Sequence, residues 1–540
     1  MTSRVPCALL SAVLLAAPSA AWALAGRLDP SFGNGGKVTT LIAGASSVVT
    51  ALAIQPDGKL VAAGYHGDFR AGDFVLVRYA VDGSLDPTFG TDGVVTTPIT
   101  PGVDQAHAVV VQPDEKLVAA GFSGGFPASE FAVVRYAPDG RLDATFGSGG
   151  VATTAIGTSA EAHGAVLQPD GKLVVAGYAQ TGGTYVFALA RYLPDGTLDG
   201  SFGSGGTVTT PIGSVEAFGL AAVLQPDGKV VVAGETDTRI ALVRYDVDGT
   251  PDATFGSGGI VTTAAGASAA AAALVRQPDG KLIVAGTRET ETIDRDVLLV
   301  RYDVDGTPDA GFGSGGVVTT SIRRPDDAMA LALQPDGKLV AGGRSSDEAT
   351  GYDFVLVRYR PDGSVDASFG SGGVVLTSVG AGGDEGAALV HQPDGKLVLA
   401  GGYDAGAAGF QFALARYLEE CPVVTTTTST TTTLPCVTPR CVVDGVVHGP
   451  CASDRIPAGI RRKLDRTPVL LAQAESSPPK KAAALRKKAV RLLDQAGRAA
   501  VQATRGKNPK LSATCGLSIK GIRGSPGFER RLAIRSVTQD

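Results

Sequence analysis

The chain has 540 residues, 73 of them glycine, and a formal net charge of -5. This length excludes a single ordinary hydrophobic core, and the glycine content, roughly twice the average, is typical of many tight turns between short strands. The charge is unevenly distributed: from Arg440 onward there are 21 basic and 7 acidic residues, whereas the rest of the chain has 27 basic and 46 acidic residues. We therefore expect an acidic body followed by a basic tail.

Residues 1–25 have the features of a secretory signal peptide. Arg4 supplies the basic start, residues 7–17 form an apolar stretch, and small residues around Ala23 and Ala25 offer cleavage sites. A membrane anchor is the alternative, but the apolar stretch is short for a bilayer. The sequence predicts a secreted protein, extracellular or periplasmic.

Residues 26–418 consist of a unit of about 57 residues that recurs seven times. The unit contains Gln-Pro-Asp, then Arg-Tyr, then Phe-Gly, and the last copy ends after Arg-Tyr. The Gln-Pro-Asp segments begin at Gln55, Gln112, Gln168, Gln225, Gln277, Gln334 and Gln392. The Arg-Tyr pairs begin at Arg78, Arg135, Arg191, Arg244, Arg301, Arg358 and Arg416. A fixed period of this length indicates a repeat architecture.

Each unit has four short apolar runs, which predict four strands. In the second unit these runs are 108–111, 117–120, 131–136 and 151–154. The first two flank a Gln-Pro-Asp turn, which predicts a hairpin because proline and aspartate favour tight turns. Runs that are apolar on both faces are typical of strands buried on both sides.

The repeats are out of phase with the ends of the domain. The first Phe-Gly, at Phe32, precedes any Arg-Tyr pair, whereas no Phe-Gly follows Arg416. The N-terminal segment therefore supplies a fourth strand that the last unit lacks, and we expect the segment around Val38 to pair with the segment around Leu414. This predicts an all-β, seven-bladed β-propeller of four-stranded blades, closed by its N-terminal strand, because closure removes free sheet edges. A linear β-solenoid is the alternative, but it gives no reason for the offset.

Segments such as LAIQPDGKLVAAG (52–64) and DFVLVRYAVDGSLDPTFGTDGVVTT (73–97) resemble the delta-60 repeat, a bacterial repeat family. The resemblance extends over roughly residues 27–418. It implies a β-propeller in an extracellular setting, and it implies no activity and no catalytic residues.

The Arg-Tyr pairs invite interpretation as a ring of ligand-binding residues. A residue present in every copy more often solves a structural problem in every copy. We expect each arginine to bind turn carbonyls or the aspartate before Phe-Gly, such as Asp86 or Asp143, and each tyrosine to pack between blades.

A candidate site precedes the first strand of several units, where acidic residues stand. If the first strand is innermost, these carboxylates gather at one mouth of the central channel, where they could attract a cation such as calcium. Two histidines at one register of adjacent units, five residues before their glutamines, could add to a metal or ligand site. The alternative is a solvated, turn-forming acidic loop. The candidate residues are Asp104, His107, Glu161, His163, Glu216, Asp327 and Asp384.

Residues 419–435 are rich in threonine and predict an extended linker. Residues 436–540 predict a small basic α-helical module tied by disulfides, whose lysines and arginines could contact an acidic envelope surface. An exported chain gives no reason to expect a nucleic-acid partner. The cysteines available for disulfides are Cys421, Cys436, Cys441, Cys451 and Cys515, so one is left over, and their pairing is not defined by the sequence.

Together these features predict a monomeric secreted scaffold that binds or presents a protein or glycan ligand at the cell exterior, without catalysis and without a required cofactor. Two alternatives stay open. One is a hydrolase or lactonase with a metal in the channel, although no nucleophile elbow, HExxH pair or phosphate loop is present. The other is an architectural component of the envelope.

Overall fold

The computed structural model describes residues 25–419, apart from 43, 68–70, 126–127, 214–215, 292–293 and 348–350, together with isolated helical positions between 463 and 499. The first 24 residues of the predicted signal peptide, all but its first residue of the predicted linker, the five tail cysteines and most of the predicted helical module lie outside the described residues. Within the described part, no helix is long and apolar enough to cross a membrane.

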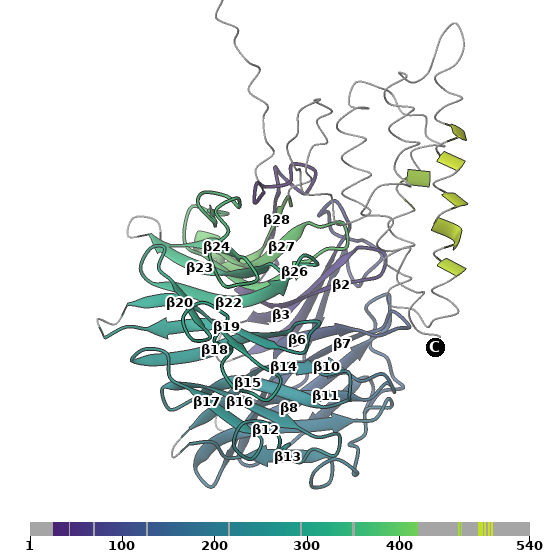
Figure 1. The fold of residues 1–540 in the computed structure, drawn as a ribbon. Coiled ribbons are helices and arrows are strands. Elements are labelled where there is room, and N and C mark those ends of the chain that lie inside the picture. Colours follow the sequence, from purple (N-terminus) through teal and green to yellow (C-terminus); the bar gives the residue numbers. More distant parts are fainter. Residues whose placement is uncertain are drawn as a thin grey trace, which may run out of the picture.

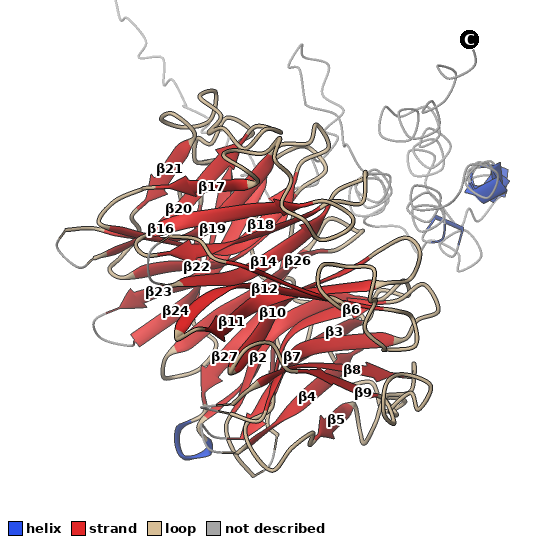
Figure 2. Cartoon of the chain, turned by 90° about the horizontal axis from the view of Figure 1, so that it is seen from below, coloured by secondary structure: helices blue, strands red, loops and turns tan. Residues whose placement is uncertain are grey.

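The described body is a seven-bladed β-propeller, and each blade is a four-stranded antiparallel sheet (Figures 1 and 2). Blade 1 comprises β2 (Ser47–Ile54), β3 (Leu60–Gly67), β4 (Gly72–Tyr79) and β5 (Val94–Thr97). Blade 2 comprises β6 (Gln105–Val111), β7 (Leu117–Ser123), β8 (Glu130–Tyr136) and β9 (Val151–Thr154). Blade 3 comprises β10 (Ser159–Leu167), β11 (Leu173–Thr181), β12 (Thr184–Tyr192) and β13 (Thr207–Thr210).

Blades 4 to 6 repeat this order. Blade 4 comprises β14 (Ala217–Leu224), β15 (Val230–Thr236), β16 (Arg239–Tyr245) and β17 (Ile260–Thr263). Blade 5 comprises β18 (Ser268–Arg276), β19 (Leu282–Glu289), β20 (Arg295–Tyr302) and β21 (Val317–Thr320). Blade 6 comprises β22 (Asp326–Leu333), β23 (Leu339–Asp347), β24 (Gly351–Tyr359) and β25 (Val374–Thr377).

Blade 7 is made from both ends of the domain. Its strands are β26 (Asp384–His391), β27 (Leu397–Asp404), β28 (Phe410–Tyr417) and, from the N-terminus, β1 (Lys37–Thr40), with the short 3-10 helix η1 (Gly406–Ala408) before β28. β1 pairs with β28 with Val38 opposite Leu414, as the phase of the repeats predicts. The purple and green ends of the described body accordingly meet in Figure 1. The ring is closed, so the alternative of a linear solenoid is wrong.

The first strand of each blade is the innermost, as expected. Each inner strand contacts those of its two neighbours, and β2 contacts both β6 and β26, which completes the circle around the channel. The core lies between blades, where aromatic and β-branched side chains of adjacent sheets interdigitate. At the closure, Phe32, Leu414 and Val75 belong to one buried cluster. Strands buried on both faces explain the continuous apolar runs in the sequence.

The repeated arginines hold each blade together and attach it to the next. In blade 1, Arg78 lies over the ring of Phe89, 4.5 Å from its centroid, and its Nε donates to Asp86 Oδ2 at 2.8 Å. Its Nη1 donates to the carbonyl of Pro138 in blade 2. The lysine of the Gln-Pro-Asp turn joins the same carboxylate, with Lys59 Nζ 3.0 Å from Asp86 Oδ2. The predicted structural role of the arginines is confirmed.

The repeated tyrosines connect each blade to the one before it. Every hydroxyl is hydrogen-bonded to a threonine hydroxyl on the outer strand of the preceding blade, at 2.7 to 2.9 Å. The pairs are Tyr79–Thr40, Tyr136–Thr97, Tyr192–Thr154, Tyr245–Thr210, Tyr302–Thr263, Tyr359–Thr320 and Tyr417–Thr377. Thr40 belongs to β1, so the closure of the ring uses the same contact as the other six junctions. The predicted packing of the tyrosines between blades is confirmed.

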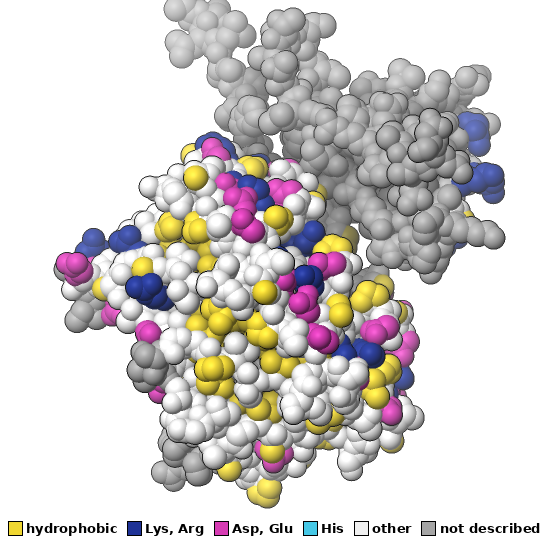
Figure 3. All heavy atoms as spheres, turned by 60° about the horizontal axis from the view of Figure 1, so that its bottom comes forward, with side chains coloured by type: hydrophobic (Ala, Val, Ile, Leu, Met, Phe, Trp, Pro, Cys, Tyr) yellow, Lys and Arg dark blue, Asp and Glu magenta, His cyan; other side chains and the backbone are white. Residues whose placement is uncertain are grey.

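The surface combines paired charges with exposed apolar side chains. On the face in Figure 3, basic and acidic side chains lie next to one another, and hydrophobic side chains gather between them. Ion pairs between turn lysines and aspartates recur in the blades, such as Lys116–Asp143 at 3.1 Å. Paired acidic residues of this kind leave the net acidic excess of this part of the chain unchanged.

Candidate functional site

Each inner strand contains a β-bulge. In blade 3 the register shifts between Ala162 and Gly164, so His163 is the extra residue. The partner strand carries Gly177 here, where a Cβ would lie 1.9 Å from the carbonyl oxygen of Glu161. Only glycine allows the two backbones to approach this closely. The bulge changes the direction of the side chain of the extra residue, which has no partner in the ladder. The seven bulged residues are Thr50, His107, His163, Leu220, Ala272, Met329 and Ala387.

The rings of the two bulged histidines are in contact. The ring centroids of His107 on β6 and His163 on β10 are 4.4 Å apart, with the rings tilted by 37°. Phe122 on β7 stacks on His107 at 5.7 Å, and Tyr178 on β11 stacks on His163 at 5.2 Å. The sequence placed the two histidines at one register, and the structure shows that this register brings them into contact.

The row of rings continues into blade 4. Phe218 on β14 meets the edge of Tyr178 at 4.9 Å, and Tyr185 on β12 lies 5.6 Å from Tyr178 and 5.2 Å from Phe218. We call this set the aromatic row; its members are Phe122, His107, His163, Tyr178, Tyr185 and Phe218. It spans blades 2 to 4, and five of its side chains, all except that of Phe122, are only partly buried.

Two carboxylates accompany the aromatic row. Glu161 Oε2 accepts a hydrogen bond from the Tyr178 hydroxyl at 2.5 Å and lies 3.8 Å from His163 Nε2. Burial alone would raise the pKa of Glu161, but His163 and the Tyr178 hydroxyl lower it below its ordinary value. Glu235 stands opposite Phe218 in the β14–β15 ladder, and burial raises its pKa. Glu161 is therefore ionised at neutral pH.

The histidines are held in an apolar setting. Burial, and then the neighbouring His163, lower the pKa of His107 well below its ordinary value, so His107 is neutral at neutral pH. Within the described residues, Nε2 of His107 and Nε2 of His163 are buried atoms without a hydrogen-bond partner. An unmade hydrogen bond at a buried polar atom costs about 1–3 kcal/mol, which a ligand or an ordered water would recover.

The predicted acidic residues take different roles. Asp104 and Asp384 are fully buried loop caps: Asp104 Oδ2 accepts from the amides of Ile99 and Thr100, and Asp384 Oδ2 accepts from that of Val379. The equivalent cap in blade 6 is Asp326, which accepts from the amides of Ile322 and Arg323. Glu216 is exposed at the start of blade 4.

Asp327 lies in a charged cluster at the same mouth in blades 5 to 7. Its carboxylate is 2.8 Å from Arg344 Nε and 3.2 Å from Arg295 Nη1, and Arg344 also reaches Glu385 at 2.7 Å. Arg344 lies over the ring of Tyr352, 4.6 Å from its centroid. The mouth thus has an aromatic half with carboxylates and a half in which the carboxylates are paired with arginines.

The sequence argument did not find the aromatic residues or the arginine partners. A signal for them exists in the residue that follows the glycine of each second strand. At this position the seven copies carry Tyr65, Phe122, Tyr178, Glu235, Thr287, Arg344 and Gly402. Variation at one position of an otherwise uniform repeat indicates that the fold does not require a particular side chain there.

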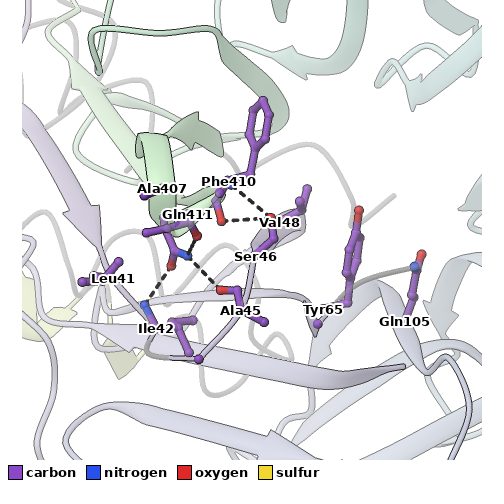
Figure 4. Close-up of a pocket in the computed structure, with 14 residues that line it drawn as sticks. Leu41, Ile42, Ala45, Ser46, Val48, Tyr65, Gln105, Ala407, Phe410 and Gln411 are labelled. Carbon is purple, nitrogen blue, oxygen red and sulfur yellow. Dashed lines mark hydrogen bonds between the residues drawn. The ribbon is translucent and has the colours of Figure 1, made fainter. Parts of the chain in front are cut away.

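A pocket of about 860 Å³ lies where the ring closes (Figure 4). The Gln411 side chain accepts from the Ile42 amide and donates to the Ala45 carbonyl, both at 2.9 Å, and so fixes the connection between β1 and β2. Tyr65 and Gln105 also line the pocket. The carboxylate of Glu385 lies near enough to add to the effect of burial in raising the pKa of Tyr65.

Metal coordination is not evident in this part of the chain. Among the described residues, no group of three or more His, Cys, Asp or Glu side chains is arranged to hold a metal ion. The expected calcium site stays a prediction.

Seven segments of the chain match the sequence profile of a family described as a domain of unknown function (DUF5122) beta-propeller. The segments are 55–89, 112–146, 168–202, 225–255, 277–312, 334–369 and 392–419. The chain carries seven DUF5122 repeats. Each of the first six DUF5122 segments runs from the glutamine of the Gln-Pro-Asp turn to the phenylalanine of Phe-Gly, or close to it, and contains the arginine and tyrosine that join the blades. The segments leave out the bulged inner strands, so His107, His163 and Phe218 of the aromatic row lie outside the DUF5122 match, whereas Phe122, Tyr178 and Tyr185 lie inside it.

The DUF5122 propeller is also similar to solved structures, all distantly. Virginiamycin B lyase from Staphylococcus aureus is 10% identical with a TM-score of 0.39, over 70% of this chain and 98% of the lyase. A protein of unknown function from Dyadobacter fermentans is 10% identical with a TM-score of 0.39, over 73% of this chain and all of that one. Sqt1 from Chaetomium thermophilum, bound to the N-terminus of ribosomal protein L10, is 14% identical with a TM-score of 0.39, over 70% and 98%. No curated protein matches the chain.

Proposed function

We propose that this protein is an exported β-propeller that binds a ligand, without converting it, at the aromatic half of its channel mouth. The observation that carries the proposal is the contact between His107 and His163 from adjacent blades, extended on both sides by Phe122 and Tyr178. Partly exposed aromatic rings offer a surface on which a ligand can stack.

The division between repeated and varied residues supports a binding role. The arginines, tyrosines and turn lysines recur in every blade and hold the ring together. The aromatic row occurs once, and none of its members is needed for the contacts between blades that the other copies make. A rigid ring with one differentiated sector presents a preorganised surface, which lowers the entropic cost of binding.

The geometry favours binding over catalysis. A serine–histidine contact does occur in blade 1, where Ser47 Oγ lies 2.8 Å from His66 Nδ1, with Asp73 opposite His66 in the ladder. The side chain of Ser47 is fully buried, so a substrate would not reach its hydroxyl. In the aromatic row, burial and the Glu161 carboxylate raise the pKa of Tyr178, which keeps its phenol protonated.

Export and anchoring complete the proposal. The signal-like residues 1–25 support secretion, and the basic residues after Arg440 support attachment to an acidic envelope surface. Recovery of the protein from the periplasm or medium, with a mature N-terminus near residue 24 or 26, is the expected result. A product that keeps Met1 and stays in the cytoplasm would contradict export.

The binding role is tested with the full chain against an array of soluble glycans and peptides. We expect a ligand that the wild type retains and that Tyr178→Ala loses. Tyr352→Ala is the matched control, since it removes an aromatic ring from the other half of the same mouth. A ligand retained equally by wild type and Tyr178→Ala, but lost by the control, would place the site elsewhere.

A further inference from the structure

We infer that the aromatic row binds a glycan that carries free amino groups. This inference rests on the proposed function and names the ligand class of the same site. It starts from a comparison of equivalent positions in different blades. Within the ladder between inner and second strands, Glu161 faces Tyr178, Phe218 faces Glu235, and Asp327 faces Arg344.

Blade 6 shows what a carboxylate at this place attracts. Asp327 is paired there with the guanidinium of Arg344 at 2.8 Å, and Arg344 lies over an aromatic ring. Blades 3 and 4 keep the carboxylates and the aromatic rings but have no arginine at these positions. Glu235 has no ion pair or side-chain hydrogen bond within the described residues. A cation supplied by a ligand would fill the role that Arg344 fills in blade 6.

The charges around the aromatic row favour a cation. On this sector of the mouth, the acidic residues Glu161, Glu216 and Glu235 outnumber the basic ones, and Arg239 at the start of β16 is exposed. The arginines that neutralise acidic residues at this mouth belong to blades 5 and 6. A ligand that enters over the row therefore meets net negative charge and aromatic faces together.

The length of the aromatic row favours a glycan over a single ammonium group. A single ammonium group needs one or two aromatic rings, whereas this row contains six rings from three consecutive blades, and five of them are partly exposed. A sugar ring has a flat face of C–H groups that stacks on an aromatic ring, and a chain of sugars repeats that face.

The inference is tested by calorimetric titration of the full chain with a glucosamine oligomer and with its fully N-acetylated counterpart of equal length, at a mildly acidic pH that protonates the sugar amine. Acetylation removes the charge and keeps the ring. We expect the amine form to bind at least about tenfold more tightly, with an affinity that falls as salt is added. A lysine-rich peptide of similar charge is the third probe.

Two isosteric variants locate the binding. Glu235→Gln should weaken the amine oligomer about three- to tenfold and leave the acetylated oligomer unchanged. Glu385→Gln is the matched control, because this carboxylate lies on the same rim but is already paired with Arg344 at 2.7 Å, and we expect no change in affinity.

The outcomes separate the inference from the proposed function. Equal binding of both oligomers, or tighter binding of the acetylated one, overturns the inference that the ligand carries free amino groups. The proposed binding role still stands in that case if Tyr178→Ala abolishes the binding of these oligomers. Binding of the peptide alone overturns the glycan inference in the same way. Binding of none of the three probes also overturns the inference, and the array of soluble ligands then decides the proposed function separately.

Discussion

The N-terminal segment closes the ring through a buried ion pair, and Asp29→Ala tests how much this contact stabilises the fold. Asp29 Oδ2 lies 2.9 Å from Arg416 Nε and 2.9 Å from Lys396 Nζ, and Asp29 and Arg416 are only 3% and 2% exposed. Burial alone would raise the pKa of Asp29, but hydrogen bonds from Ser31 and Lys396 lower it from 3.8 to about 2.

Two estimates bound the expected cost. The lowered pKa corresponds to about 2 kcal/mol of stability, which is present above the unfolded-state pKa and is lost as the pH falls through about 2. Removal of one partner from a buried pair costs about 3–5 kcal/mol, because the other charge stays buried without compensation. We therefore expect Asp29→Ala to lower the free energy of unfolding by about 2–5 kcal/mol.

Urea unfolding of the full chain, followed by circular dichroism, measures this loss. Asp252→Ala is the matched control: its carboxylate lies 2.6 Å from both Arg244 Nε and Lys229 Nζ inside blade 4, where no closure is involved. Both variants should shift the transition midpoint by similar amounts. If Asp252→Ala shifts it and Asp29→Ala does not, the N-terminal segment does not contribute to the ring, and the reasoning fails.

Three further changes have defined outcomes. The pKa of His107 is lowered on folding, so the unfolded chain takes up a proton at a higher pH than the folded chain does. The free energy of unfolding should therefore fall as the pH drops below about 6.5, by at most about 1.4 kcal/mol per pH unit. His107→Phe should make urea midpoints less dependent on pH between neutral and acidic conditions. Tyr136→Phe removes the buried hydrogen bond to Thr97 and should cost about 1 kcal/mol in urea unfolding; an unchanged midpoint would show that the hydroxyl pair contributes nothing. Gly83→Ala should cost about 2 kcal/mol more than Gly35→Ala, since both glycines have positive φ but only the Cβ at position 83 would meet side chains, at 2.8 Å; equal thermal shifts would contradict this.

The closed ring was predictable because it depends on counting. Phe32 comes before the first Arg-Tyr pair and nothing replaces it after Arg416, so one blade must be completed from the other end of the chain. The structural roles of the arginines and tyrosines were predictable for a similar reason, since a residue present in every unit must satisfy a contact present in every unit. The strand limits were less accurate: β6 begins at Gln105, three residues before the predicted start, because the bulge at His107 interrupts the apolar pattern.

The candidate site was predicted only in part. The shared register of His107 and His163 indicated that they meet, but Tyr178 and Phe218 join them from strands that the repeat pattern treats as scaffold. Asp104 and Asp384 were assigned to the channel mouth, yet their carboxylates point into their own loops and accept backbone amides. In blade 6, Asp326 takes this capping role, and Asp327 is left for Arg344. Sequence spacing does not distinguish these two neighbours, because only the loop backbone decides which carboxylate turns inward.

The seven tyrosine–threonine contacts include Tyr79–Thr40, which joins the two ends of the domain by the same bond that joins every other pair of blades. The two ends of the propeller domain therefore meet at one of seven junctions that share the same tyrosine–threonine hydrogen bond. The amide of Gly26 donates to the carbonyl of Leu418 at 2.9 Å, so a short covalent bridge could span the gap between them. A circularly permuted chain, opened between β9 and β10 instead, would therefore assemble the same seven-bladed propeller.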